Sequence, residues 1–219
     1  DPGRFAFAGS ATAEGRLSIP LGASPGQTVL DGTLTVADGE FIERQSGFRL
    51  EGLDGTVTYT RNGLAGDGIA ATLAGWPAAL NIAAAWDADT PFTASLTGRF
   101  PASLLAMKTP LSDDPLLARV EGETDWSLGL AITRVPGQEG GEVWLEVASD
   151  LEGVAVPLPA PLNKPSEARW PLVLSYPIRS ERPVVRATLA DRLDLALELD
   201  RTLVTENAPV DAPVDAPEA

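Results

Sequence analysis

The side chains that could do chemistry in this sequence are carboxylates, because histidine and cysteine are both absent. Their absence excludes thiolate nucleophiles, imidazole-dependent triads and the usual zinc ligands. Acidic residues cluster at Asp113 and Asp114, at Glu121, Glu123 and Asp125, and at Asp194, Glu198 and Asp200. A glycoside hydrolase needs two such carboxylates on either side of a cleft, so this is the reaction class to weigh.

The pattern around these carboxylates favours a solvated face over an active site. Asp194, Glu198 and Asp200 share one parity and alternate with leucines, as the wet face of a strand requires. The Asp-rich run Asp87–Thr90 lacks the ligand spacing of an EF-hand loop, although calcium binding stays possible in principle. We therefore predict a protein that is not an enzyme, with no catalytic residue, no metal and no cofactor.

Charge and composition narrow the partners. The chain has 219 residues, a formal net charge of −15 and 44% hydrophobic residues. Such an acidic surface repels phosphate backbones, so nucleic acid is not expected as a partner. The longest apolar stretch, Leu73–Trp86, is shorter than the ~20 residues of a membrane-spanning helix and contains Pro77. The chain opens at Asp1 without methionine, and we interpret it as a piece of a longer protein.

Alternation of apolar and polar residues is the main structural signal. In the run FTASLTGRF, Phe92, Ala94 and Leu96 share one parity, and Thr93 and Ser95 take the other. This period of two predicts strands with one apolar and one wet face. The predicted strands are Val29–Val36, Phe48–Thr60, Ile69–Leu73, Phe92–Phe100, Thr124–Ile132, Val143–Val147 and Arg192–Leu199. At 77–86 a helix competes because alanine is abundant, but the period of two favours a strand.

Turn signals connect these strands into an antiparallel meander. Short-hairpin dipeptides stand at Asp38-Gly39, Asn62-Gly63 and Asp67-Gly68, where positive φ is cheap. Further corners are predicted at Trp76-Pro77 and at Asp87–Pro91. Together they predict about six strands between Val29 and Phe100.

Helix is expected only around residues 102–120, where the chain could also be subdivided. Ala102–Lys108 and Asp114–Val120 each have the length and composition of a short helix, and Asp114-Pro115 is a typical helix start. Residues 206–219 repeat APVD and form a low-complexity acidic tail. We predict one all-β module over residues 1–205 followed by this tail.

Alternation does not say what covers the apolar face of the strands. The faces can close on one another as the core of a β-sandwich, which is the commoner outcome for such strands. Alternatively, they line a groove whose occupant is a ligand. The residues alone leave both possibilities open.

Three stretches resemble YhdP-type members of the AsmA-like family of Gram-negative bacteria. The most specific is SDLEGVAVPLPAPLNKP (Ser149–Pro165), and VEGETDWSLGLAI (Val120–Ile132) resembles the stretch that precedes it. FRLEGLDGTVTYTRNGLAGDGIAATLAGWPAALNIA (Phe48–Ala83) is similar in pattern. The resemblance covers most of residues 30 to 175, whereas the first twenty residues and the tail resemble nothing in the family.

The resemblance implies a long, curled antiparallel sheet with an open hydrophobic groove. It also implies a non-enzymatic role in moving phospholipid through the periplasm towards the outer membrane. The full-length protein would be tethered to the inner membrane by an N-terminal anchor absent from this chain, with neighbouring β-groove modules of the same chain as partners. The expected lining is Val57, Tyr59, Ile69, Leu73, Leu80, Ile82, Trp86, Phe92, Leu96, Phe100, Trp126, Leu128, Leu130, Ile132, Val143, Leu145, Val147, Val156 and Leu158. The alternative function is a structural scaffold or adhesin segment, a closed sandwich without ligand.

The proline-rich run Val156–Pro165 has its own hypothesis. Pro157, Pro159 and Pro161 occupy every second position, so a strand here would lack three N–H donors along one edge. Such a strand can pair on one side only, and we expect it at the rim of the groove with its apolar residues inward. The alternative is an extended loop across the surface.

Overall fold

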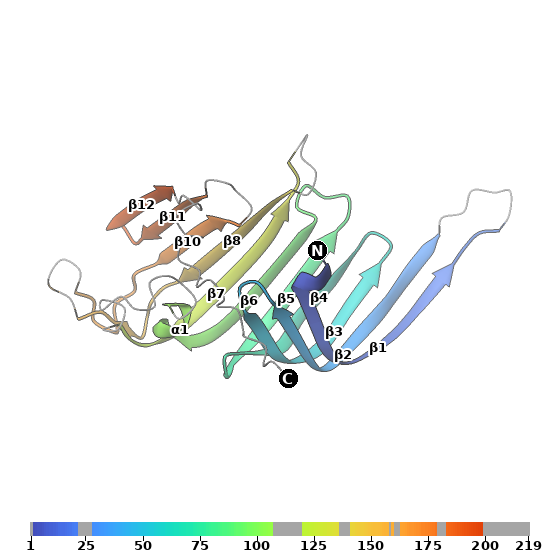
Figure 1. Cartoon of the computed structure of the whole chain (residues 1–219), viewed down its shortest axis with the longest axis horizontal. Helices are drawn as coiled ribbons and strands as arrows, with labels where there is room; N and C mark the ends of the chain where they lie inside the picture. The colour runs from blue at the N-terminus through green and yellow to red at the C-terminus, as the bar shows by residue number, and fades with distance from the viewer. Residues whose placement is uncertain are drawn as a thin grey trace, which may run out of the picture.

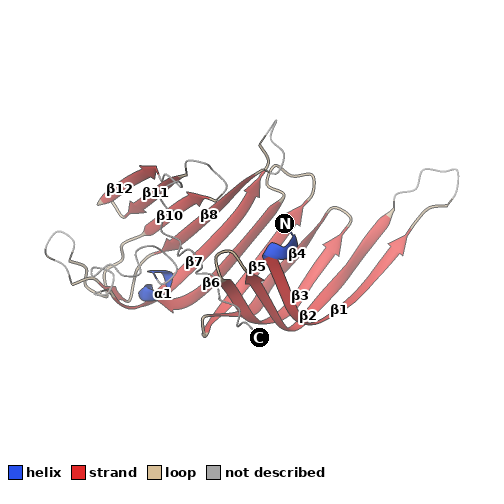
Figure 2. Cartoon of the chain, viewed as in Figure 1, coloured by secondary structure: helices blue, strands red, loops and turns tan. Residues whose placement is uncertain are grey.

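A computed structural model describes residues 2–21, 28–106, 120–135, 141–157, 159, 163–178 and 183–198. These residues form a twelve-stranded antiparallel sheet with very little helix (Figures 1 and 2). The strands are β1 (Phe5–Ser18), β2 (Val29–Glu43), β3 (Phe48–Thr60), β4 (Gly63–Leu73), β5 (Trp76–Ala85), β6 (Phe92–Pro101), β7 (Glu121–Thr133), β8 (Glu142–Ser149), β9 (Val154–Ala155), β10 (Leu172–Pro177), β11 (Val184–Leu189) and β12 (Leu193–Glu198). The described helices are the 3₁₀ turn η1 (Pro2–Arg4) and α1 (Ala102–Ala106).

The sheet is a meander that does not close on itself. The strands lie in chain order from β1 to β8 and continue through β10, β11 and β12, while β9 leaves this path and pairs with β7. β1 and β12 therefore lie at opposite edges of the sheet, and Figure 1 shows them far apart. The predicted all-β, antiparallel, open fold is confirmed. None of the helices among the described residues has the length and apolar composition needed to cross a membrane.

Local sequence explains most strand boundaries. β3 begins and ends where the alternation predicts, and β5 confirms the strand interpretation at 77–86 over the helical one. β1, β10 and β11 were not predicted, although Phe5 and Phe7 in β1 share one parity, as do Leu172 and Leu174 in β10. The expected helical region begins with α1, and residues 107–119 lie outside the described residues. The division into module and tail is untested, because 199–219 are also outside.

Two of the three predicted hairpin dipeptides are wrong. A hairpin does stand at Asn62-Gly63, but its two-residue turn is Arg61-Asn62, since Thr60 pairs with Gly63. Asp38-Gly39 and Asp67-Gly68 instead lie inside β2 and β4, where the strand register shifts. Positive φ is present at Asp38 (49°) and Gly68 (62°), but it produces β-bulges that bend the strand without reversing it. As a result, residues 29–100 contain five strands, and not six.

The Trp76-Pro77 corner is also misplaced by two residues. The turn is at Ala74-Gly75, where φ is positive at both residues, and β5 starts at Trp76. The corner predicted at Asp87–Pro91 is confirmed, since these residues connect β5 to β6.

The bulges of the first four strands form a corner in the sheet. The β1–β2 register shifts between Ala8 and Ser10, and a Cβ on Gly9 would lie 2.5 Å from the carbonyl oxygen of Asp38. The two bulges thus lie side by side, and β1 and β2 change direction along their length in Figure 1. Each bulge frees a backbone donor from the ladder. Asp38 N–H donates to Asp54 Oδ1 (3.1 Å).

A second corner bond follows the same rule in β4. Gly68 N–H donates to Asn81 Oδ1 (2.7 Å), so a side chain of the neighbouring strand again satisfies the freed donor. The bends are therefore built into the sheet by paired backbone and side-chain groups.

Two clusters of buried apolar side chains lie on one face of the sheet. One contains Leu50, Ala71 and Leu96 in the middle of the sheet. The other gathers at one end of the strands, and its buried members are Phe100, Trp126, Leu151, Val154 and Trp170. The second cluster exists because the chain between β8 and β10 folds back over the strand ends.

Candidate functional site

One face of the sheet is apolar across eight neighbouring strands. Residues that pair directly across an antiparallel ladder point to the same face. One row of such partners runs from β4 to β12 through Ile69, Leu80, Leu96, Leu128, Val147, Leu174, Ala187 and Leu195. A second row contains Ile82, Ala94, Leu130, Leu145 and Tyr176. A third contains Ala84, Phe92, Ile132 and Val143. We call the surface made by these rows and their continuation into β1–β3 the apolar face.

The strand register brings sixteen of the nineteen predicted lining residues to this face. They are Val57, Tyr59, Ile69, Leu73, Leu80, Ile82, Phe92, Leu96, Phe100, Trp126, Leu128, Leu130, Ile132, Val143, Leu145 and Val147. Trp86 does not join them, because it follows the end of β5 and is 49% exposed. Val156 forms an isolated bridge with Lys164, and Leu158 lies outside the described residues. That these residues line a groove stays a prediction.

The proline-rich run is not a rim strand where it is described. Val156 pairs with Lys164 of the same segment, and Pro157 and Pro159 are exposed outside any strand. Lys164 is close in sequence, so the segment folds on itself before it can reach a sheet edge. The described part of Val156–Pro165 fits the loop alternative.

Exposure along the apolar face increases towards the two edge strands. In the central row, Leu96 is 4% exposed, whereas Leu195 at the β12 edge is 36% exposed. At the β1 edge, Phe7 is 77% exposed and Leu17 is 63% exposed. The edge strands of the apolar face therefore expose large apolar side chains to water.

Sequence reasoning missed the aromatic part of this face. Phe41 of β2 packs against Phe7 (5.2 Å between ring centroids), Phe5 (6.0 Å) and Phe48 (6.4 Å). Register partners place Phe7 opposite Phe41, and Phe41 opposite Leu50 of the buried core. The sequence does contain the pattern that predicts this face, because Phe5 and Phe7 alternate with Ala6 and therefore point to the same side of a strand.

Tyr59 has a structural role that the prediction did not include. Its hydroxyl donates to the carbonyl of Glu14 two strands away (3.3 Å). The ring passes over Gly32 and Gly15, where an added Cβ would lie 2.4 and 2.3 Å from the Tyr59 oxygen. Glycine is needed at both positions because the ring occupies the place of their side chains. Tyr59 therefore forms part of the surface and ties β1 to β3.

The strongest electrostatic feature of the apolar face is a buried carboxylate at the start of the sheet. Glu43 is 8% exposed, and Arg4 Nε donates to its Oε1 (2.7 Å). Burial raises the pKa of Glu43, but hydrogen bonds from Ser46, Arg4 and the backbone N–H of Gln45 outweigh it and lower the pKa from 4.5 to about 2. This carboxylate is fully used by its partners, so it serves the fold and not a reaction.

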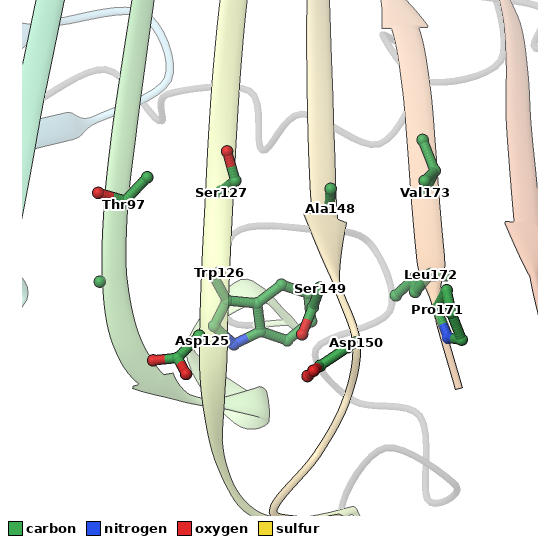
Figure 3. Close-up of a pocket in the computed structure, with 11 residues that line it drawn as sticks. Thr97, Asp125, Trp126, Ser127, Ala148, Ser149, Asp150, Pro171, Leu172 and Val173 are labelled. Atoms are coloured by element: carbon green, nitrogen blue, oxygen red, sulfur yellow. The ribbon is translucent and has the colours of Figure 1, made fainter. Parts of the chain in front are cut away.

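The opposite face is polar and carries the acidic clusters. Asp194 and Glu198 alternate with the leucines of β12 and are exposed, as predicted, while Asp113, Asp114 and Asp200 lie outside the described residues. Figure 3 shows an open hollow on this face, where Thr97, Ser127, Ala148 and Val173 are register partners. Asp125 and Asp150 lie at its end.

Neither carboxylate at the hollow has the surroundings of a catalytic acid. The Asp125 side chain is 81% exposed and lies 3.6 Å from Arg99 Nη1, while Asp150 pairs with Arg169 at 3.7 Å. Exposed ion pairs of this kind are common on protein surfaces and do little chemistry. Among the described residues there is also no group of three or more acidic side chains able to hold a metal ion. The geometry supports no hydrolytic site here.

One end of the apolar face is covered by a folded segment with two arms, residues 150–157 and 163–171, which we call the clasp. It lies over the ends of β6 and β7, where Phe100 is 0% exposed and Trp126 is 5% exposed. Trp126 Nε1 donates to the carbonyl of Phe100 (3.3 Å). The apolar face is thus closed at this end, while in the row of Leu128 the side chain of Leu96 is buried in the cluster with Leu50 and Ala71.

Comparison with known proteins adds the family. The comparison with curated proteins gives no match, and that with solved structures gives none either. A family model described as YhdP protein matches residues 5–214, which is nearly the whole chain. The match extends into β1 and β2, beyond the stretches on which the sequence resemblance rested. Together with the open, one-sided antiparallel sheet, it shows that this chain belongs to the YhdP family.

Proposed function

We propose that this chain is a non-enzymatic lipid-transport module, whose apolar face shields phospholipid acyl chains as they pass between the inner and outer membranes. In this proposal the chain works in the periplasm as part of a protein anchored in the inner membrane. Its partners are phospholipid and neighbouring sheet modules of the same protein. Membership of the YhdP family supports the lipid-transport role.

The observation that carries the proposal is the continuity of the apolar rows. The row through Leu128 crosses eight strands from β4 to β12 without a charged residue. Exposing hydrocarbon to water costs about 0.8 kcal/mol per CH₂, so two sixteen-carbon chains would cost ~25 kcal/mol. A continuous apolar surface removes much of this cost at every position along the row.

The chemistry of the face also fits a hydrocarbon occupant. Acyl chains offer no hydrogen bonds to read, so scattered Leu, Ile, Val and Phe side chains are sufficient to hold them. The charged side chains of β12 lie on the opposite face, where Asp194 and Glu198 are exposed to water. We expect these carboxylates to be dispensable for lipid binding.

The scaffold alternative makes a different prediction about the same face. A closed sandwich needs a second sheet over the apolar rows, and the described residues contribute to one path of strands with only the short β9 beside it. A scaffold would use its apolar face to bind protein and would not take up lipid. Lipid loading of the purified chain separates the two functions.

The test is Leu128→Glu, with Ser127→Glu as the matched control. Ser127 directly precedes Leu128 in β7 and lies exposed on the polar face, so the control adds the same charge to the same strand. The purified proteins are incubated with phosphatidylcholine vesicles containing a phospholipid with a fluorescent acyl chain, and bound lipid is measured. We expect Leu128→Glu to abolish loading, because a carboxylate among acyl chains loses its hydration without gaining a partner. Ser127→Glu should load normally.

Thermal unfolding of the same samples separates a lost site from a lost fold. If Leu128→Glu unfolds, Leu195→Glu replaces it, because Leu195 belongs to the same row and is 36% exposed, so the charge reaches water in the empty protein. A folded variant of this row that loads lipid normally would contradict the proposed path. Failure of the unmodified chain to load any lipid would favour the scaffold.

A further inference from the structure

The clasp is held together around a single buried ammonium group. Lys164 is 1% exposed, and its Nζ donates to the carbonyls of Leu151 (2.7 Å), Val154 (2.7 Å) and Pro165 (3.2 Å). Three acceptors match the three protons of an ammonium group. Burial lowers the pKa of Lys164, while the charges of Asp150, Glu167 and Glu152 raise it.

The bonds to Lys164 join the two arms of the clasp. Leu151 and Val154 belong to the first arm, and Lys164 and Pro165 to the second. Leu151 has a φ of 56°, which is costly for a side chain with a Cβ, and its carbonyl is held in this conformation by Lys164. Val156 and Lys164 also exchange both backbone hydrogen bonds, at 2.9 and 3.1 Å. Loss of the ammonium group would remove one donor from each of the three carbonyls, although Leu151 O and Pro165 O also accept the backbone N–H groups of Val154 and Ala168 (3.2 Å each).

The clasp in turn connects strands from both sides of the covered end. Its β9 pairs with the start of β7 through Gly122 and Val154. Trp170, from the second arm, is 8% exposed and packs in the cluster with Phe100 and Trp126. On the far side, the Arg192 guanidinium lies 4.3 Å from the Trp170 ring, in the turn between β11 and β12.

A surface ion pair secures the outer side of the second arm. Arg169 Nε donates to Glu152 Oε2 (2.7 Å), and the pair joins the second arm to the first. These side chains are about half exposed, so the pair contributes far less than the buried bonds. Lys164 is therefore the central connection of the clasp.

We propose that Lys164 is a positioning residue for the lipid path: it fastens the clasp over the ends of β6, β7 and β10, and the fastened clasp closes this side of the apolar face to acyl chains. The inference rests on the proposed function and adds a boundary to it. Lipid occupies the rows of Leu128 and Leu130, and it cannot leave past Phe100 and Trp126 while the clasp is closed.

The test replaces the lysine by a reversible covalent link. The chain contains no cysteine, so Val156→Cys/Lys164→Cys introduces a single pair. Residues that exchange both backbone bonds have Cα atoms about 5.5 Å apart, which suits a disulfide. The oxidised form keeps the arms together without Lys164, and the reduced form lacks both connections. Lys164→Met, of similar length and without charge, is the second variant.

Two measurements are made on each form. Hydrogen exchange of the amides of Leu151–Val154 and 163–170 reports clasp opening, and transfer of the fluorescent phospholipid to acceptor vesicles reports its release. We expect the reduced pair and Lys164→Met to lose protection in the clasp and to release lipid roughly tenfold faster or more, the factor that corresponds to one charged buried hydrogen bond. The oxidised pair should behave like the unmodified chain.

Each contrary result has a separate meaning. Unchanged clasp protection in Lys164→Met would show that the lysine is not the fastening. Loss of protection with an unchanged release rate would show that the clasp does not bound the lipid path. If the unmodified chain binds no lipid, the proposed function is wrong, and the clasp cannot be a boundary of a lipid path. Hydrogen exchange would still show whether Lys164 holds the two arms of the clasp together.

Discussion

The two ends of this sheet are shaped by opposite means. The open wing, β1 to β4, bends at bulges, and Phe7 at its outer edge is 77% exposed, although Leu50 and Ala71 of its inner strands are buried. The clasped end, around the ends of β6 and β7, has a second layer of chain over the same face, and Phe100 there is 0% exposed. The same apolar pattern thus gives a surface at the β1 edge and a covered core at the clasped end.

The difference shows that alternation decides which face is apolar but not what covers it. In the wing, shape comes from backbone conformation, with the freed donors of Asp38 and Gly68 satisfied by neighbouring side chains. At the clasped end, shape comes from a segment fixed by Lys164 and Trp170. A lipid path needs both properties, since it must be open along its length and closed where lipid should not escape.

The largest expected contrast is between two phenylalanines on this face. Phe100→Ala should lower the free energy of unfolding by about 3–5 kcal/mol, because the buried ring leaves a cavity that the clasp cannot fill. Phe7→Ala should change it by about 0.5 kcal/mol or less, because the ring is mostly in water already. Urea denaturation of both variants checks this. Equal losses would mean that the wing is as well packed as the clasped end, which would remove the distinction.

Two glycines with positive φ give the next largest expected difference in stability between the two regions. In the clasped end, Gly122 has φ +109° and an added Cβ would lie 2.1 Å from the carbonyl oxygen of Gly153. In the wing, Gly68 has φ +62° and nothing within 4 Å of an added Cβ. Gly122→Ala should therefore cost roughly 2–4 kcal/mol, from strain and displacement of β9, against about 1 kcal/mol of backbone strain for Gly68→Ala.

Hydrogen exchange locates the effect of these glycine variants. Gly122→Ala should increase exchange in the clasp, at Val154 and its neighbours, because the β7–β9 pairing is lost. Gly68→Ala should increase it only around the β4 bulge. A Gly68→Ala variant that also opens the clasp would show that bend and clasp are one cooperative unit.

The sequence predicts which side of each strand is apolar better than it predicts where the sheet bends or which segment covers it. The parity of Leu96, Leu128 and Leu130 is a local property, so the strands and their apolar side followed from it. Asp38-Gly39 and Asn62-Gly63 look alike because a dipeptide reports only that positive φ is cheap. Whether the chain then reverses or bulges depends on how the neighbouring strands pair, which is not local information.

The clasp was the part that sequence reasoning could not assemble. The sequence places Lys164 in a proline-rich run but does not predict its hydrogen bonds. Its three acceptors are backbone carbonyls, and every residue type has a backbone carbonyl. Trp170 was not singled out, and its partner Arg192 is reached only after two more strands. Helix was expected in front of β7, and it begins there as α1, but the cover over Phe100 comes from a different segment.

The smallest expected effect is the loss of stability in acid that results from protonation of Glu43 in the wing. The pKa of Glu43 is lowered to about 2 in the folded protein, from 4.5, by its bonds to Ser46, Arg4 and the Gln45 N–H. A carboxyl group with a lowered folded pKa binds protons more tightly when unfolded. Its contribution is therefore present above about pH 4.5 and is lost as the pH falls towards 2. The central charge of the clasp is the ammonium of Lys164, which stays protonated in acid.

Comparison with Glu43→Gln isolates this contribution from the titration of other carboxylates. We expect the unmodified chain to be the more stable at pH 7 and the difference in free energy of unfolding to shrink between pH 4.5 and 2. Hydrogen exchange at about pH 2.5 should then show β1 and the start of β2 losing protection before the clasp, because most of the stabilisation by the Glu43 carboxylate is lost once the unfolded state binds the proton. A stability difference that does not change with pH would mean that Glu43 acts by packing alone. Simultaneous opening of the wing and the clasp in acid would contradict the separation of the two regions, since Glu43 lies in the wing and the central group of the clasp is the ammonium of Lys164.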